Sequence, residues 1–224
     1  MTRARRAAGR VALSLLLSCA PGSVWPAAQT FGLDDAPASA QDARNRVAQA
    51  RALEQRADWP GLLALGQAWA RAEASNPLAW FVQGRAYAAM GRPADAIAAY
   101  ERNLRLAPDD ARARNNLGNA WRDSGRPREA MQAYRAAVEA DPDYVQAWRN
   151  LGLTFYLARG QAGAARALER LRAVDPALAE VWRALAVDYA ASGDPRVAER
   201  AVDALRGLDA AQRKRLFDAL FAED

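Results

Sequence analysis

The chain has 224 residues, of which 31 are Lys or Arg and 26 are Asp or Glu, and 51% of its residues are hydrophobic. It contains no histidine and one cysteine, Cys19, which excludes Ser-His-Asp and Cys-His catalysis and the HExxH and Cys/His zinc sites, so we expect no enzymatic activity, metal or cofactor. Four of the basic residues lie within the first ten positions, so the rest of the chain is nearly neutral and lacks the clustered positive charge of a nucleic-acid-binding surface.

Residues 1–28 have the composition of a bacterial secretory signal peptide. A cationic segment ending at Arg10 is followed by the largely apolar run 11–17, and then by prolines and small residues. This is the order of n-region, h-region and cleavage zone, and the run is too short to span a bilayer. We expect cleavage after Ala28 or Gly22, which gives a soluble periplasmic or exported protein without cysteine, a composition suited to an oxidising compartment.

Two alternatives for this leader stay open. The segment Leu16-Leu17-Ser18-Cys19 resembles a lipobox, in which lipidation of Cys19 anchors the protein to a membrane. A leader that is not cleaved leaves a cytoplasmic protein with a basic tail. The next segment, 29–40, combines Pro, Gly, Ser, Ala and Asp without periodicity and is predicted to be a flexible linker.

From residue 77 onward the sequence repeats itself every 34 residues. A unit of this length holds two short helices and their turns, and such pairs bury their apolar faces only by stacking on neighbouring pairs. The recurring residues are Trp80, Trp148 and Trp182; Leu117, Leu151 and Leu185; Gly84, Gly118 and Gly152; Tyr87, Trp121, Phe155 and Tyr189; Ala96, Ala130, Ala164 and Ala198; and Pro108, Pro142 and Pro176.

Each recurring residue type has a physical reason. The glycine and the alanine let the two helices of a pair approach closely, and the aromatic residue three positions after the glycine fills the space between repeats. A second set of glycines is predicted to end the first helices in a left-handed conformation, and prolines are predicted to begin the second helices. These are Gly91, Gly125 and Gly193, and Pro93, Pro127 and Pro195.

These columns resemble the tetratricopeptide repeat (TPR), whose pattern is W-x2-L-G-x2-Y, then A-x3-F, then P. The resemblance covers four units, 77–110, 111–144, 145–178 and 179–212, and implies an all-α fold, a right-handed α-solenoid of antiparallel helix pairs. The third unit departs from the pattern, because Gly160 lies one position late and Leu168 replaces the aromatic residue found at Tyr100 and Tyr134.

The two ends of the array are predicted from weaker patterns. Residues 41–76 resemble a degenerate N-terminal pair, with one helix from about Asp42 to Arg56 and another from Leu62 to Ala74. Residues 209–224 predict a C-terminal capping helix with one apolar stripe. We interpret this helix as a lid over the last repeat; occupation of the binding groove or of a dimer interface is the alternative.

In the TPR family the first helices line a concave groove in which ligands usually bind. Asn116 and Asn150 take the same groove position in neighbouring units, with Asn119 one turn beyond, which resembles the asparagine ladder of the TPR superhelix of O-GlcNAc transferase. The resemblance assigns partner binding to Phe81, Arg85, Asn115, Asn116, Asn119, Arg122, Arg149, Asn150, Tyr156 and Arg183.

Each residue type has a binding interpretation and a structural one. Amides both donate and accept hydrogen bonds, so they are suited to hold a peptide backbone without reading its sequence; alternatively they complete local helix packing. The arginines are suited to an acidic partner or are simply solvated. Phe81, Tyr156 and Leu157 are candidate apolar anchors.

We therefore expect a protein–protein interaction adaptor of the bacterial cell envelope, which binds a partner peptide or helix in the concave groove. Two alternatives are a non-catalytic accessory subunit of an envelope-assembly or polysaccharide-synthesis complex, and a cytoplasmic TPR regulator with an intact leader. The sequence does not indicate the oligomeric state.

Overall fold

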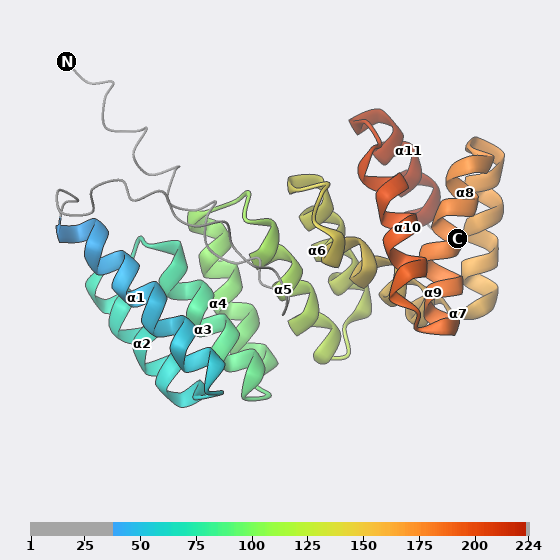
Figure 1. Cartoon of the computed structure of the whole chain (residues 1–224). Helices are drawn as coiled ribbons and strands as arrows, with labels where there is room; N and C mark the ends of the chain where they lie inside the picture. Colours follow the sequence, from blue (N-terminus) through green and yellow to red (C-terminus); the bar gives the residue numbers. More distant parts are fainter. Residues whose placement is uncertain (1–37, 223–224) are drawn as a thin grey trace, which may run out of the picture. The chain divides into compact units, whose positions relative to one another are not determined.

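The computed structural model of the chain describes residues 38–222 (Figure 1). The predicted signal peptide and Cys19 lie outside the described residues. The chain divides into two units, 1–43 and 44–224, and all of the helix pairs from α2 onward lie in the second unit. No helix within residues 38–222 combines the length and the apolar character needed to cross a bilayer.

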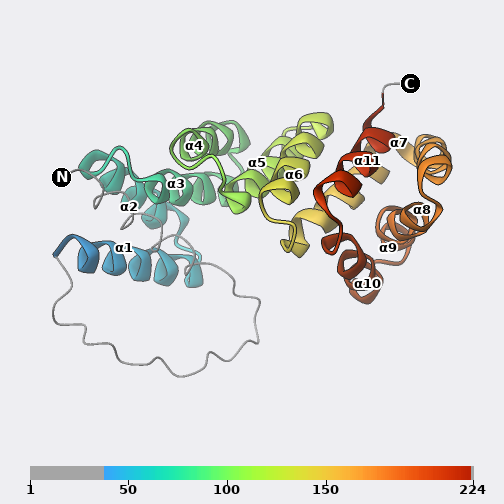
Figure 2. The ribbon, with the colours of Figure 1, turned by 90° about the horizontal axis from the view of Figure 1, so that it is seen from above.

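The described residues form helices and no strands, which confirms the all-α solenoid of helix pairs. From α2 to α10 consecutive helices pack against each other, and the first helices of neighbouring repeats, α3, α5 and α7, also touch (Figure 2). The elements are α1 (Ala38–Gln55), α2 (Trp59–Ala72), α3 (Pro77–Ala89), α4 (Pro93–Leu106), α5 (Ala111–Asp123), α6 (Pro127–Ala140), α7 (Val145–Val174), α8 (Pro176–Arg183), the π-helical turn η2 (Ala184–Asp188), α9 (Tyr189–Ser192), α10 (Pro195–Arg206) and α11 (Ala210–Phe221). Helix α1 begins within the segment expected to be a linker.

Helix boundaries follow from caps and prolines. Asp110 accepts hydrogen bonds from the backbone N–H groups of Arg112 and Ala113 at 3.1 and 3.0 Å, and so satisfies donors that a helix start leaves free. Proline occupies the first position of α3, α4, α6, α8 and α10, where its missing N–H costs nothing. The left-handed glycines at the ends of first helices are confirmed: Gly91, Gly125 and Gly193 have φ of 68, 73 and 65°.

The glycine of the first helix allows close packing, but its neighbour differs between repeats. A Cβ added to Gly84 or Gly118 would lie 2.6 or 2.5 Å from the ring of Tyr100 or Tyr134 in the second helix of the same pair. At Gly152 the nearest atom belongs instead to Leu185, at 2.8 Å. The expectation of close approach within the pair is therefore right for the first two units and wrong for the third, where the first helix of the next repeat takes that space.

The third and fourth units depart from a regular pair of helices. Helix α7 contains both helices of the third unit, which meet at Gly160 with φ 64° and ψ 177°. In the fourth unit α8, η2 and α9 follow one another without a break, and Arg183 pairs with Asp188 at 2.7 Å alongside η2. The second helix of this unit is α10.

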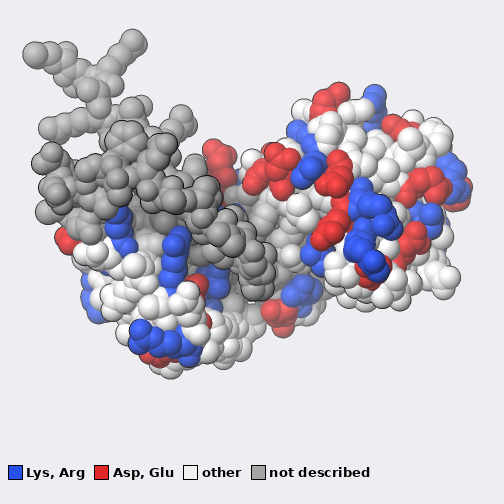
Figure 3. Space-filling model, viewed as in Figure 1, with Lys and Arg blue, Asp and Glu red and all other residues white. Residues whose placement is uncertain are grey.

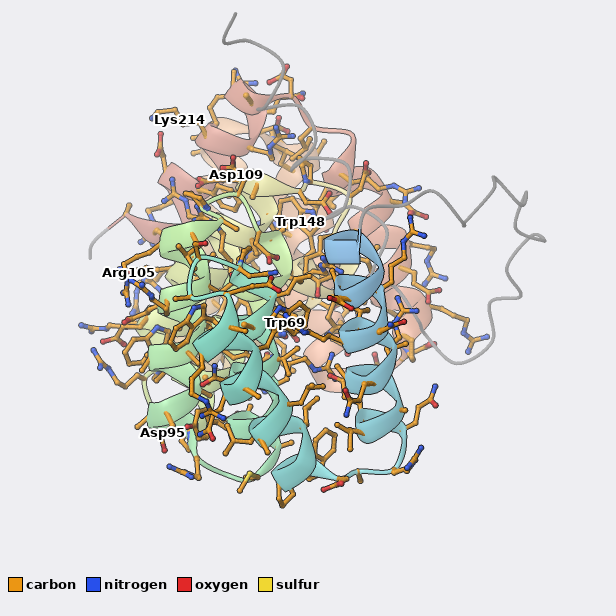
Figure 4. The ribbon with its side chains drawn as sticks, turned by 90° about the vertical axis from the view of Figure 1, so that its left-hand side faces the viewer. Trp69, Asp95, Arg105, Asp109, Trp148 and Lys214 are labelled. Carbon is orange, nitrogen blue, oxygen red and sulfur yellow. The ribbon has the colours of Figure 1, made fainter. Side chains whose placement is uncertain are left out.

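The buried apolar side chains form two clusters. One joins α1, α2 and α3 around Leu62, Trp69 and Val82. The larger one joins α6, α7, α8, η2, α10 and α11. Figure 4 shows Trp69 and Trp148 inside the molecule, whereas Arg105 and Lys214 point outward.

Candidate partner-binding face

Helices α5 and α7 bring five amide side chains together. We call Asn115, Asn116, Asn119, Gln146 and Asn150 the amide face. The Nδ2 group of Asn150 donates to Oδ1 of Asn115 at 2.9 Å and to Oδ1 of Asn119 at 3.2 Å. Gln146, one turn before Asn150, donates to Oδ1 of Asn150 at 3.0 Å. The amide face therefore bridges the first helices of the second and third repeats.

Tyrosines of the second helices support this face from behind. The Tyr134 hydroxyl donates to Oδ1 of Asn119 at 2.7 Å. Burial raises the pKa of Tyr134 to about 12, and burial likewise raises the pKa of Tyr100, so both phenols stay protonated at neutral pH. A protonated Tyr134 holds Asn119 in one orientation.

Burial separates the amides into two groups. Asn115 and Asn150 are 2% and 8% exposed, so their hydrogen-bonding groups serve the contact between repeats. Asn116 and Asn119 are half-buried and Gln146 is exposed. Of the two interpretations of the asparagines, packing describes Asn115 and Asn150, while Asn116, Asn119 and Gln146 present amide groups at the surface.

The predicted arginines have partners within the chain. Arg85 pairs with Glu54 at 2.9 Å and Arg122 with Asp123 at 3.3 Å. Arg183 pairs with both Glu180 at 2.9 Å and Asp188 at 2.7 Å. These carboxylates already balance the positive charge, so the arginines give no particular preference for an acidic partner.

Arg149 contacts an aromatic side chain. Its Nη2 group donates to the Tyr189 hydroxyl at 3.1 Å, and its guanidinium carbon lies 5.4 Å from the centre of that ring. The contact joins α7 to α9 of the next repeat, which gives Arg149 a packing role.

The two aromatic candidates lie in different surroundings. Phe81 is 3% exposed, and its ring meets Tyr100 edge-on at 5.9 Å. It cannot serve as an exposed anchor, because close packing of α3 on α4 covers it. Tyr156 is half-buried, and the neighbouring Leu157 is 67% exposed. The first helix of the third repeat therefore exposes apolar surface near its end, shortly before Gly160.

Two contributors to the face are absent from the sequence-based candidates. Gln146 precedes Asn150 by four residues, so helical spacing alone places them on one face. No spacing pattern points to the Tyr134 hydroxyl, because packing alone explains why an aromatic ring recurs at this position of the repeat. Among the described residues, no group of three or more His, Cys, Asp or Glu side chains is arranged to hold a metal ion.

On the face drawn in Figure 3, charges of both signs alternate over the C-terminal helices. Several exposed ion pairs of residues 38–222 join residues three or four positions apart, such as Arg126 with Glu129 and Lys214 with Asp218, and contribute little stability. The amides, rather than charge, distinguish the candidate face.

Comparison with known proteins agrees with this architecture. The sequence model of the tetratricopeptide repeat family matches residues 81–145 and 122–177. A crystal structure of the MamA protein is similar in fold, with a TM-score of 0.50 and 20% sequence identity over 80% of this chain and 92% of that one. YrrB, described as a TPR protein with an unusual peptide-binding site, has a TM-score of 0.49 and 18% identity over 82% of this chain and 92% of its own.

No curated protein sequence matches the chain. The family match and the succession of packed helix pairs nevertheless agree on one architecture, with the same 34-residue period visible in the sequence and in the glycine contacts. The chain is a tetratricopeptide repeat protein, with its matched repeats in residues 81–177.

Proposed function

We propose that the protein is a non-catalytic protein–protein interaction adaptor of the bacterial cell envelope, and that it binds an extended peptide of a partner on the amide face. The observation that carries this proposal is the pre-ordered amide set of α5 and α7. Asn150 and Tyr134 fix the orientations of Asn115 and Asn119, while Asn116 and Gln146 remain at the surface.

This arrangement suits recognition of a peptide backbone. Each surface amide offers an N–H₂ donor and a carbonyl acceptor, the two groups that an extended backbone presents in complementary form. Because buried hydrogen bonds already orient Asn119, less side-chain freedom is lost on binding. Because the amides contact the partner's backbone, they do not select its sequence. Specificity for a sequence therefore comes from apolar contacts with exposed side chains such as Leu157.

The binding proposal is tested with Asn116→Ala/Gln146→Ala, which removes two surface amides, including the Gln146 donor to Asn150, and keeps Asn115, Asn119 and Asn150. The matched control is Gln132→Ala, which removes an exposed amide from α6, the second helix of the second repeat. Each neutral hydrogen bond contributes about 0.5–1.5 kcal/mol, so we expect the double variant to bind the partner about tenfold more weakly. The partner is isolated from envelope extract with the wild-type chain, and its affinity for all three forms is then measured.

Equal affinity of all three forms would place the partner on another face. Equal helicity and equal melting temperature of the three forms are required, so that altered binding reflects the lost amides.

The envelope location is supported by the leader pattern of residues 1–28 and by the confinement of cysteine to position 19. Mass spectrometry of the native N-terminus tests it. Cleavage after Gly22 or Ala28 supports export, a lipidated Cys19 supports a membrane-anchored form, and an intact Met1 contradicts the envelope location.

A further inference from the structure

One side of α7 continues the amide face towards the fourth repeat. Gln146, Arg149, Asn150 and Leu153 recur at intervals of three and four residues, so they share this side of the helix. Asn150 connects it to α5, and Arg149 connects it to α9 through the Tyr189 hydroxyl. An extended chain that crosses the amide face and continues to the fourth repeat therefore passes Arg149.

Helix α11 packs on the opposite side of α7. Phe217 stacks on Trp148 with ring centres 5.9 Å apart, and Phe221 meets Phe155 edge-on at 6.2 Å. The Arg135 guanidinium of α6 lies 5.0 Å from the centre of the Phe217 ring. Helical spacing places both contacted rings of α7 opposite to the amide face. The lid expected over the last repeat therefore covers the second and third repeats instead, and it does not occupy the binding face.

Within residues 38–222, Arg149 has no carboxylate partner. The other three arginines that were predicted to bind a partner each pair with a carboxylate of this chain, whereas Arg149 contacts the neutral hydroxyl of Tyr189. The acid next to Tyr189 in the chain, Asp188, is engaged by Arg183 through both of its oxygens at 2.7 and 2.8 Å. The positive charge of Arg149 is therefore not balanced by an ion pair.

Partial burial weakens the hydration of this cation. Arg149 is half-buried, and its Nε atom is buried without a hydrogen-bond partner. A guanidinium that has lost part of its hydration is stabilised when a carboxylate contacts it. Because Nη2 is engaged by Tyr189 and Nε is buried, Nη1 is the nitrogen that remains for a ligand.

The turn before α10 explains why Tyr189 contacts Arg149. In the second repeat, Arg126 of the corresponding turn lies 4.2 Å from the centre of the Trp121 ring, which has the position of Tyr189. In the fourth repeat this turn carries Asp194 instead, and its carboxylate caps the start of α10. The ring of Tyr189 is therefore available to Arg149, whose guanidinium carbon lies 5.4 Å from its centre. The fourth repeat thus holds Arg149 in place before a ligand binds.

We propose that Arg149 binds the carboxylate of an Asp or Glu side chain in the partner peptide, at the side of the amide face nearer to the fourth repeat. This inference rests on the proposed function, since the amide face must hold the backbone of that peptide. A hydrogen bond from a guanidinium to a carboxylate is charge-assisted and stronger than a neutral one. The amides hold the backbone, and Arg149 selects one acidic side chain in it.

Peptide selection followed by affinity measurement tests the inference. Random peptides displayed on phage, which have no free C-terminus, are selected on the full wild-type chain. An acidic peptide from this selection is synthesised with an amidated C-terminus, together with a version in which each acidic residue is replaced by its amide. Both versions are measured against wild type, Arg149→Gln and the control Arg105→Gln, which changes an exposed, outward-pointing arginine of α4 (Figure 4).

We expect Arg149→Gln to bind the acidic version about tenfold or more weakly than wild type does, and the amide version equally well. Arg105→Gln should bind both as wild type does, and Arg149→Lys, which keeps the charge, should retain the preference for the acidic version. Because both versions are compared on the same variant, a loss of packing at Arg149 lowers both affinities equally and does not imitate this result.

The contrary outcomes separate this inference from the proposed function. A selection without acidic peptides, or a preference for the acidic version that Arg149→Gln leaves unchanged, overturns the role of Arg149. So does an equal loss of both versions. The proposed function stands in each case when Asn116→Ala/Gln146→Ala weakens the binding of the selected peptides. Peptides that this double variant binds as tightly as wild type does, or a selection that yields no peptide, overturn both.

Discussion

Asn150 illustrates how one side chain joins two repeats. It is buried between α5 and α7, donates to both Asn115 and Asn119, and accepts from Gln146. Both the amide nitrogen and the amide oxygen of Asn150 are thus paired with amides of the neighbouring turn or repeat. These hydrogen bonds therefore fix the register between α5 and α7, the first helices of the second and third repeats.

Replacing this side chain tests its structural weight. Asn150→Ala leaves the buried Oδ1 of Asn115 without its donor, and we expect a loss of about 1–3 kcal/mol in the free energy of unfolding. Urea unfolding followed by circular dichroism measures it. Gln132→Ala, at an exposed position of α6, should change stability by less than about 0.5 kcal/mol, and an equally small effect of Asn150→Ala would contradict the assigned role.

The sequence predicts which positions of the repeat these residues occupy better than it predicts how deeply they are buried. The 34-residue spacing places Asn116 and Asn150 at equivalent positions, yet one is at the surface and the other is buried. Phe81 likewise occupies a predicted binding position but packs against Tyr100. Burial depends on how far neighbouring helices approach, and that distance is set by side chains of other repeats.

At the scale of elements, Gly160 divides α7 into its two helices. Its φ of 64° and ψ of 177° lie in a region that is populated almost only by glycine. Gly193 has a similar φ of 65° but a ψ of 5°, which is left-handed helical geometry that asparagine also adopts.

This difference predicts two outcomes for one substitution. Gly160→Asn should lower the free energy of unfolding by about 1–3 kcal/mol, whereas Gly193→Asn should cost at most a few tenths, because asparagine is an accepted residue at a left-handed helix end. Chemical denaturation of both variants gives the comparison. Equal losses would show that the conformation of Gly160 is not what divides α7.

Helix α1 is tied to α2 through Glu73. This carboxylate accepts hydrogen bonds from Asn76 at 2.8 Å and Trp69 at 3.2 Å, and it pairs with Arg46 of α1. The hydrogen bond from Asn76, with those from Trp69 and Arg46, holds the pKa of Glu73 below its usual 4.5. Because the pKa is lower in the folded state, the stabilisation is present above the unfolded pKa and is lost as pH falls through the folded pKa.

The resulting prediction concerns Glu73→Gln. At pH 7 the variant should unfold at lower denaturant concentration than the wild type, and the difference should shrink as pH is lowered from about 5 to 3. Urea unfolding over this pH series measures the trend, with Glu101→Gln on the exposed side of α4 as the control. A difference that stays constant with pH would exclude a contribution from the charged form of Glu73.

Helix positions were largely predictable, and helix partners were not. Proline and aspartate mark helix starts within a few residues, because capping is a local interaction. Helix α11 packs on α7, where Leu168 replaces the aromatic residue of the earlier repeats, and Leu185 of the fourth unit covers Gly152. Such packing involves residues from three different repeats, which no local pattern contains.

At the scale of the whole molecule, the buried apolar side chains are divided between two clusters. Between the cluster of α1–α3 and that of α6–α11, the junction is α5, whose buried apolar side chains are all alanines, whereas α4 also buries Ile97 and Tyr100. Ala96, Ala99, Ala111 and Ala113 are all nearly inaccessible to solvent. Since stability in a repeat array depends on each interface between neighbours, this junction should be the weakest one.

Hydrogen exchange in moderate urea should detect this division. We expect amides of α1–α3 to exchange together at lower urea than those of α6–α11, because their cluster buries fewer large side chains. Mass spectrometry of peptic fragments from the intact chain resolves the two groups. A single transition shared by both would mean that the alanine interface couples the clusters fully.

The docking of α11 on α6 and α7 also determines where the array can change in length. A further 34-residue unit inserted in the turn before Asp110 would leave every contact among α6, α7 and α11 in place. The same unit inserted between Tyr144 and Val145 would carry Arg135 away from Phe217, whereas the ring contacts between α7 and α11 would stay in place. Insertion after the second repeat therefore removes the contact between Arg135 and Phe217, which insertion before that repeat preserves.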